Sequence, residues 1–312
     1  MLHIFQDQVL GKGAGGIVYA GEFCNSPVAI KRIRSGLDSQ NSAKAAKETL
    51  MALNELRILR RIRHPNIVLF YGACLDGSIG DVMLVLEQVQ GTMLDECVAQ
   101  LEVWKAGPPM SQEQASILTG TCRALTYLHS RQPVIVHSDL KPGNILVEWR
   151  NRQPFPRLLD FGLSRRLTRN ETIRGGSPRY IAPEVMRGGS PLTPAADVFS
   201  LGVLLFFVAS GRKPWARYQD NAIVQRAREA CLPPLSWVLQ TALLSQLRPR
   251  IEQCIALDPT DRPSVQLVYD EIVSGGQGPP GHHQATISPL TNPASSSGSL
   301  ENPANCAAII PL

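Results

Sequence analysis

Up to residue 90, short β-branched apolar runs alternate with glycine, proline and polar breaks, a pattern typical of strands. One longer stretch, residues 42–63, instead repeats its apolar positions near a period of 3.6, which predicts a helix. The first third of the chain is therefore expected to be strand-rich with a single helix. The expected strands are residues 3–10, 16–23, 27–33, 66–75 and 82–89.

Beyond Gly91 the periodicity becomes helical. A small sheet unit followed by a larger helical unit indicates an α+β fold with two lobes. Residues 274–312 are rich in Ser, Gly, Pro and Asn without any period, which predicts a disordered low-complexity tail. The expected helices are residues 111–130, 194–210, 221–229, 243–257 and 263–272.

Composition and charge exclude several classes of protein. The net charge of +5 is too small to indicate a nucleic-acid partner. The seven cysteines are scattered without zinc-ligand spacing, which favours reduced thiols and a cytoplasmic protein. The most apolar run, residues 198–209, has 12 residues, whereas a membrane span needs about 20. We expect no membrane span, and the N-terminus lacks the pattern of a signal peptide.

A polar loop between two apolar runs carries Asp139, Lys141 and Asn144 within residues 134–147. Pro142 and Gly143 are ordinary turn residues, so this stretch taken alone predicts only a buried hairpin. The close spacing of a carboxylate, an ammonium and an amide indicates a function only when it is considered together with the other motifs of the chain.

Residues 11–18 fit the pattern G-x-G-x-x-G-x-V. A Rossmann site would need a helix at the third glycine, where the sequence favours a strand, and a Walker A loop would need a terminal G-K-[ST]. Two interpretations stay open. The glycines either turn a hairpin and nothing more, or they let its backbone approach phosphates closely because no Cβ intervenes.

Lys31 lies on the third expected strand, where a lysine is usually a solvated edge charge. The following helix offers two carboxylate partners, Glu55 and, two turns earlier, Glu48. Glu55 is preferred from its spacing to the strand that follows His64. An ion pair at about 4 Å is worth on the order of 4 kcal/mol at an effective dielectric constant near 20, enough to hold the lysine over phosphates.

Two further motifs follow in order, Asp160-Phe161-Gly162 and Ala182-Pro183-Glu184. With the glycine-rich run, Lys31 and the Asp139 loop, they make the chain resemble eukaryotic protein kinases over about residues 3–273. The resemblance implies a bilobal kinase fold in a domain of residues 1–273. It implies a five-stranded antiparallel N-lobe (about 1–87) carrying the helix that the family calls αC, a hinge (about 87–91) and a mainly helical C-lobe (about 92–273).

The resemblance also implies roles for these residues. Asp139 would accept the proton of the substrate hydroxyl or orient that hydroxyl. Lys141 would neutralise the γ-phosphate, and Lys31 with Glu55 would position ATP. Asn144 and Asp160 would hold Mg2+, for which Mn2+ is a possible substitute. The implied nucleotide contacts are Gly11, Lys12, Gly13, Gly16, Val18, Ala29, Lys31, Leu86, Glu87, Val89, Leu146 and Asp160, with Val18, Ala29 and Leu146 around adenine, Leu86 as gatekeeper and Glu87 to Val89 as hinge.

Other positions match the family's structural framework. Asp197 resembles the residue that anchors the hydrophobic column of an active kinase, and Glu184 is expected to pair with Arg262. The hydrophobic column of an active kinase would consist of Leu59, Phe70, His137 and Phe161. For these apolar residues, ordinary core packing explains the residue type equally well.

The loop D-L-K-P-G-N and the stretch beginning at Gly176 resemble the serine/threonine type. Ser177 would bond to Asp139 and Lys141. The chain is most similar to the tyrosine-kinase-like group, near Raf-like and mixed-lineage kinases. The implied function is ATP-dependent phosphorylation of serine and threonine hydroxyls of protein substrates in intracellular signalling, with no nucleic-acid partner. The sequence names neither the substrate nor the upstream regulators.

Ser138 departs from the family, which usually has an arginine there that receives an activation-loop phosphate. Because serine cannot pair bidentately with phosphate, we hypothesise that activation-loop phosphorylation is not obligatory. The alternative is a pseudokinase or scaffold that binds ATP. Thr168 and Thr172 remain candidate phosphorylation sites, with arginines at 165, 166, 169 and 174 nearby.

Two other features of the sequence are given structural rather than functional interpretations. A basic run is interpreted as a solvated helix face rather than a docking site for an acidic partner or nucleic acid: Arg57, Arg60, Arg61 and Arg63. Residues 151–156 are expected to form a longer hairpin turn.

Overall fold

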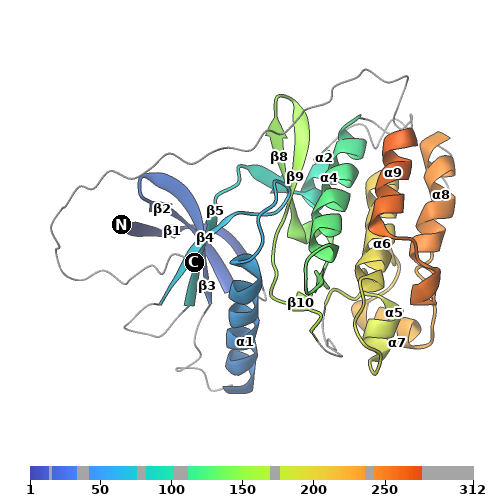
Figure 1. Cartoon of the computed structure of the whole chain (residues 1–312), viewed down its shortest axis with the longest axis horizontal. Coiled ribbons are helices and arrows are strands. Elements are labelled where there is room, and N and C mark those ends of the chain that lie inside the picture. The colour runs from blue at the N-terminus through green and yellow to red at the C-terminus, as the bar shows by residue number, and fades with distance from the viewer. Residues whose placement is uncertain are drawn as a thin grey trace.

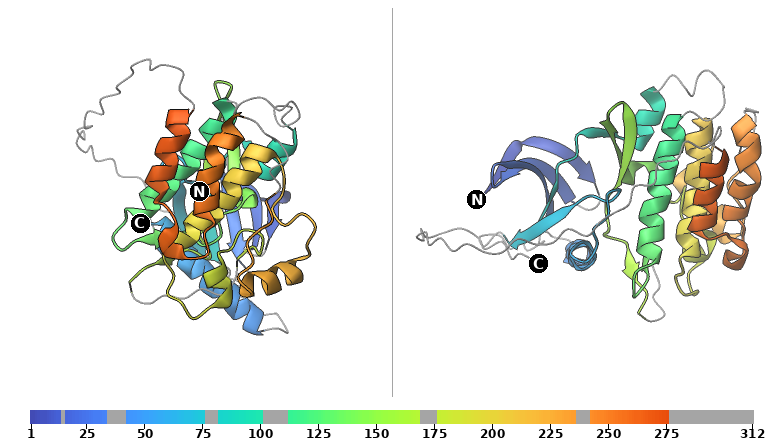
Figure 2. Two further views of the ribbon diagram at one scale, coloured as in Figure 1. Left: turned by 90° about the vertical axis from the view of Figure 1, so that its right-hand side faces the viewer. Right: turned by 45° about the horizontal axis from the view of Figure 1, so that its top comes forward.

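The computed structural model describes residues 1–13, 16–33, 42–75, 82–100, 112–168, 176–235 and 242–275. Two lobes make up the molecule (Figure 1). The five-stranded sheet and α1 lie at one end, helices α4, α6, α8 and α9 stand side by side at the other, and β8 and β9 lie between them. A second view shows the same separation (Figure 2). The predicted α+β class and kinase-like plan are confirmed.

The N-terminal sheet is antiparallel throughout, in the order β1-β2-β3-β5-β4. All five predicted strands exist. The strand predicted over residues 66–75 begins only at Phe70. Residues 66–69 are not part of the sheet, because Asn66 O and Val68 N bond to Leu158 of the other lobe at 2.9 and 3.1 Å. The strands are β1 (Leu2–Gly13), β2 (Gly16–Phe23), β3 (Ser26–Ile33), β4 (Phe70–Leu75) and β5 (Val82–Glu87).

Helix α1 (Ser42–Leu59) covers this sheet through buried Ala52, Ile58 and Leu59. It ends four residues before the predicted boundary. The Arg63 guanidinium donates to Leu59 O at 2.9 Å, so it adds a strong bond to a carbonyl that the end of the helix leaves with only a long backbone bond of 3.4 Å from Ile62 N.

Helices dominate the second lobe, as predicted, and their bounds shift by a few residues. Two short helices, α2 and α5, were not predicted, because segments of five to seven residues carry little periodic signal. The helices are α2 (Leu94–Gln100), α4 (Gln112–His129), α5 (Pro183–Arg187), α6 (Ala195–Ser210), α7 (Asp220–Arg228), α8 (Ala242–Cys254) and α9 (Val265–Gly275), with 3-10 turns η1 (Pro142–Asn144) and η2 (Pro259–Asp261).

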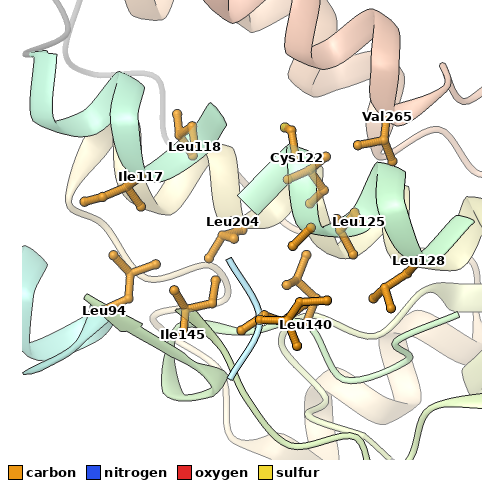
Figure 3. Packing of buried hydrophobic residues seen from close by; sticks show 14 of the residues in the cluster. Leu94, Ile117, Leu118, Cys122, Leu125, Leu128, Leu140, Ile145, Leu204 and Val265 are labelled. Atoms are coloured by element: carbon orange, nitrogen blue, oxygen red, sulfur yellow. The ribbon is translucent and has the colours of Figure 1, made fainter. Parts of the chain in front are cut away.

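The core of this lobe seats the Asp139 loop. Leu140 and Ile145 point into a cluster formed by the apolar row of α4 and by Leu204 of α6 (Figure 3). Leu140 is completely buried although both of its neighbours are polar. Burial of this leucine fixes the backbone between Asp139 and Lys141.

The strands beside the Asp139 loop correct one expectation. They do not form a hairpin with each other, because β7 (Ile135–Val136) pairs with β10 (Arg165–Arg166), whereas β8 (Ile145–Arg150) pairs with β6 (Gly91–Met93) and β9 (Gln153–Leu158). The polar loop therefore passes between two separate sheets, and its apolar flanks are anchored independently.

Residues 151–156 are likewise not a long turn. The turn between β8 and β9 consists of Asn151 and Arg152, with φ of 49° and 63°, and Gln153 already pairs with Arg150. Two consecutive positive φ values are typical of a tight two-residue hairpin turn, so the additional residues lengthen the strands.

Among the helices of the described ranges, none combines the length and the apolar character that a membrane crossing requires. The first two residues of the predicted tail, 274 and 275, instead belong to α9. The rest of the predicted tail, from residue 276, lies outside the described residues, and its disorder stays a prediction.

Candidate active site

A buried ion-pair network joins the two lobes at Lys31. Its Nζ lies 2.7 Å from Glu55 Oε2 on α1 and 3.1 Å from Asp160 Oδ1 in the second lobe. Glu55, preferred over Glu48 from the sequence, is thus the helix carboxylate that pairs with the lysine. Burial opposes the charge of Lys31, but Glu55 and Asp160 outweigh it and raise the pKa above its ordinary value.

The two carboxylates differ in their surroundings. Burial raises the pKa of Glu55, and Lys31 opposes this rise. Burial also works against the charge of Asp160, but Lys31 and the Gly162 N–H lower its pKa below the usual value. Asp160 is the more open of the two, with its side chain 36% exposed, so it stays ionised where a cation can reach it.

The Asp160 segment is held in a defined conformation. Asp160 has a φ of 56°, and its Oδ1 accepts the Gly162 N–H at 3.2 Å. Phe161 is fully buried, its N–H donates to Glu55 Oε1 at 3.4 Å, and its ring meets His137 edge-on at 5.0 Å. The buried phenylalanine keeps the carboxylate of Asp160 turned toward Lys31.

The carboxylate of Asp139 is surrounded by donors. Its Oδ2 accepts from Lys141 Nζ at 2.8 Å and from Asn144 Nδ2 at 2.9 Å. Its Oδ1 accepts from the backbone and the hydroxyl of Ser177 at 3.0 and 3.1 Å, and Lys141 Nζ also reaches Ser177 Oγ at 2.8 Å. The loop residues therefore form one hydrogen-bonded cluster, including the Ser177 contact expected from the sequence.

Asp197, at the start of α6, carries the backbone of this loop. Its Oδ2 accepts the His137 N–H and its Oδ1 the Ser138 N–H, each at 2.8 Å. His129 Nε2, from the end of α4, lies 2.9 Å from Oδ2. The carboxylate is completely buried, and its bonds fix the two residues that precede Asp139.

Ser138 is held in the loop by its backbone rather than by its side chain. The residue is buried with a φ of 69°, and its hydroxyl lies 3.5 Å from Val136 O, at the limit of a hydrogen bond. A non-glycine residue in this conformation is strained by about 1–3 kcal/mol and persists only where its surroundings fix it. The bond from Ser138 N to Asp197 supplies that constraint.

The Asn144 loop lies directly beside the Asp160 segment, because Leu159 N donates to Asn144 O at 2.8 Å. Asn144 Nδ2 is used by Asp139, which leaves its side-chain carbonyl oxygen for another partner. In the described part of the chain, no group of three or more His, Cys, Asp or Glu gathers to hold a metal. Two oxygen ligands still fit Mg2+, which takes its remaining ligands from phosphates and water.

The predicted nucleotide contacts of the first lobe are brought into register by the sheet. Gly13 pairs with Gly16, Gly11 with Val18, and Val18 in turn with Lys31, while residues 14 and 15 lie outside the described ranges. Lys12 is exposed in the same hairpin, and Ala29 pairs with Leu86, the predicted gatekeeper.

Gly16 cannot carry a side chain here. Its φ is 118°, and a Cβ would lie 2.4 Å from Arg32 O. The backbone of the glycine hairpin thus depends on glycine at this position.

The predicted hinge contains a contact that the sequence did not indicate. The Glu87 carboxylate is bound by Arg157 of β9 and accepts the Leu69 N–H at 3.1 Å. The Glu87 side chain is therefore bound by Arg157 and by the Leu69 backbone. Val89 packs against the core, and Leu146, from β8, is half-buried.

Two predicted structural features occur. Arg262 binds Glu184 through two parallel hydrogen bonds of 2.6 and 2.8 Å. The four residues of the proposed hydrophobic column are all buried, at 2% exposure or less: Leu59, Phe70, His137 and Phe161.

Of the candidate phosphorylation sites, Thr168 is exposed, whereas Thr172, Arg169 and Arg174 lie outside the described residues. The Arg165 guanidinium donates to Ser164 O at 2.9 Å. The side chains of the basic run are exposed, as expected of a solvated face: Arg57, Arg60, Arg61 and Arg63.

Comparisons with known proteins agree with this geometry. The family model described as protein kinase domain matches residues 5–272 of the chain. Serine/threonine-protein kinase pelle of Drosophila melanogaster is 30% identical over 286 residues, covering 84% of this chain and 55% of pelle. Mitogen-activated protein kinase kinase kinase 7 of Homo sapiens is 31% identical over 269 residues, covering 84% of this chain and 40% of the relative.

Dual specificity protein kinase shkC of Dictyostelium discoideum is 30% identical over 279 residues, covering 86% of this chain and 50% of shkC. The chain thus spans about half the length of the curated relatives it matches.

Proposed function

Because this chain belongs to the protein kinase family, we propose that it transfers the γ-phosphoryl group of Mg-ATP to serine and threonine hydroxyls of proteins in intracellular signalling. The observation that carries this proposal is the cluster around Asp139, whose two oxygens are held by Lys141, Asn144 and Ser177. Phosphoryl transfer depends on positioning and charge neutralisation, and this cluster supplies both.

Each residue has a separate task in the proposed reaction. Asp139 orients the substrate hydroxyl and accepts its proton as the bond to phosphorus forms, while Lys141 neutralises charge on the transferred group. Lys31, fixed by Glu55, holds the nucleotide phosphates. When bound, Mg2+ would neutralise phosphate charge, and Asp160 with Asn144 would hold it, Mn2+ being a possible substitute.

Serine and threonine are the proposed acceptors because Ser177 and Lys141 meet beside Asp139. The two side chains make a shallow floor that suits a short hydroxyl side chain. The test is incubation of the wild-type protein with γ-labelled Mg-ATP and a generic basic protein, followed by acid hydrolysis. Phosphoserine and phosphothreonine are expected; a predominance of phosphotyrosine would contradict the assignment.

We further propose that activation-loop phosphorylation is not obligatory. Asp197 binds the backbone of Ser138, so this contact holds the Asp139 loop without a phosphate-binding side chain at position 138. Phosphatase-treated enzyme is expected to keep its activity within about twofold, since no arginine stands at position 138 to receive the phosphate. Collapse of activity after treatment, with recovery on autophosphorylation, would refute this.

The alternative is a nucleotide-binding pseudokinase, and only Ser138 favours it. Pseudokinases typically lack the strand lysine, the loop aspartate or the metal-binding aspartate, whereas Lys31, Asp139 and Asp160 are all present and in contact with their partners. Binding of Mg-ATP without any transfer in the labelling experiment would select this alternative.

The remaining assignments are proposals as well. We assign residues 1–273 to the catalytic domain and residues 274–312 to a tail. Six cysteines in the described ranges are free thiols, which supports a reducing compartment such as the cytoplasm. The proposed partners are protein substrates, and the upstream regulators are not assigned.

A further inference from the structure

Asn54, the residue before Glu55 on α1, ties this helix to the segment that begins at Asp160. Its Nδ2 lies 2.8 Å from Ser164 O, 3.1 Å from Gly162 O and 3.4 Å from Phe161 O. Three carbonyl oxygens around one amide can be served only by its NH2 end, so the surroundings determine the orientation of the side chain. Asn54 thus binds the backbone that directly follows Asp160, while the neighbouring Glu55 binds Lys31.

The contact continues into the catalytic loop. Ser164 is completely buried, and its hydroxyl donates to His137 O at 2.9 Å. His137 N in turn donates to Asp197 at 2.8 Å. A path of hydrogen bonds therefore runs from α1 through the Asp160 segment to the Asp139 loop, and none of its links uses the side chain of Ser138.

We propose that Asn54 is a positioning residue that latches residues 160–164 to α1. It keeps Asp160 beside Lys31 without the phosphate-to-arginine contact that kinases with an arginine at the Ser138 position use. This inference rests on the proposed function, because it explains how the site stays assembled when the activation loop carries no phosphate. Neither composition nor periodicity points to Asn54, since its partners are all backbone oxygens.

Two substitutions separate this role from simple packing. Asn54→Ala removes the hydrogen bonds and is expected to lower kcat about tenfold at saturating Mg-ATP in phosphatase-treated enzyme. Asn54→Asp keeps the shape but directs a carboxylate at three carbonyl oxygens, so it is expected to lower kcat further. If the side chain only fills space, the isosteric aspartate is the milder change, and that order would overturn the proposal.

A matched control is Asn66→Ala. Asn66 Nδ2 also donates to a backbone carbonyl, at 3.0 Å to Pro156 O, but toward β9 rather than the active site. Both alanine variants are expected to lower Tm by similar amounts, and only Asn54→Ala to lower kcat. Titration with a fluorescent ATP analogue counts folded sites, so misfolded enzyme is not mistaken for slow enzyme. Equal kcat in the two variants would contradict the latch.

Hydrogen exchange tests the latch independently of catalysis. Asn54→Ala is expected to raise amide exchange of residues 160–164 at least tenfold over wild type, and Asn66→Ala to leave it unchanged. If the wild-type protein transfers no phosphate, the proposed function fails while this measurement still decides about the latch. Unchanged exchange in Asn54→Ala would overturn the inference even in an active kinase.

Discussion

The substitution Asp197→Asn tests whether Asp197 anchors the Asp139 loop to α6. Asp197 Oδ2 accepts from His137 N and contacts His129, and Oδ1 accepts from Ser138 N. Asparagine has the same shape but only one acceptor oxygen. In either orientation of its amide, one of the two backbone N–H groups then faces an NH2 group.

The magnitude follows from this arrangement. An unsatisfied buried donor costs about 1–3 kcal/mol, and the hydrogen bonds that remain are no longer charge-assisted, which adds about 1 kcal/mol. The total of about 2–4 kcal/mol corresponds to a fall in Tm of roughly 4–8 °C for a domain of this size. Because the N–H group that loses its acceptor belongs to one of the two residues just before Asp139, kcat is expected to fall at least tenfold.

The assay is thermal unfolding of both proteins as a function of pH, with kcat measured beside it. Burial opposes ionisation of Asp197, but His129 and the backbone donors lower its pKa below the usual value. Such a carboxylate stabilises the fold above its unfolded-state pKa of about 3.9, and the stabilisation is lost as pH falls through the lower folded-state pKa. The gap in Tm between wild type and variant is therefore greatest near neutral pH and shrinks in acid.

A variant with wild-type Tm and kcat at neutral pH would refute this reasoning, since it would mean that the three contacts of Asp197 do not hold the loop. A gap in Tm that widens in acid would show that the pKa of Asp197 is shifted in the opposite direction.

Three further changes test other parts of the account. Leu140→Ala is expected to cost about 3 kcal/mol in urea unfolding, because the side chain is completely buried; a loss below about 1 kcal/mol would contradict its place in the core. Ser177→Ala is expected to lower kcat severalfold while Ser177→Thr retains it, and steady-state kinetics showing equal losses would exclude the hydroxyl contact with Asp139. Arg262→Met leaves Glu184 charged and largely buried, so it is expected to cost about 3–5 kcal/mol; unchanged chemical denaturation would show that the pair adds nothing.

The sequence predicted those parts of the site that combine a distinctive residue type with a fixed spacing. The pair of Lys31 with Glu55 and the bonds of Ser177 to Asp139 and Lys141 were predicted, and the structure contains them. The contact of Lys31 with Asp160 was not predicted. Long elements such as α6 were predicted because their apolar pattern extends over several turns.

Other features have no signal along the chain. The hairpin expected around the Asp139 loop was wrong because strand partners are chosen by tertiary packing, and β7 and β8 each find a different partner. Arg157, His129 and Asn54 were missed because their partners lie far away in sequence or are backbone atoms. An arginine, a histidine or an asparagine with such a partner looks like any other polar residue.

The central claim is that the hydrogen-bonded cluster around Asp139 performs phosphoryl transfer. The most direct measurement compares wild type and Asp139→Asn in single-turnover transfer from Mg-ATP to a protein substrate, with nucleotide affinity determined on the same samples. We predict nucleotide binding within about twofold of wild type and a transfer rate lower by about 10²–10⁴. An Asp139→Asn protein that still transfers phosphate at a rate close to that of wild type would contradict the account.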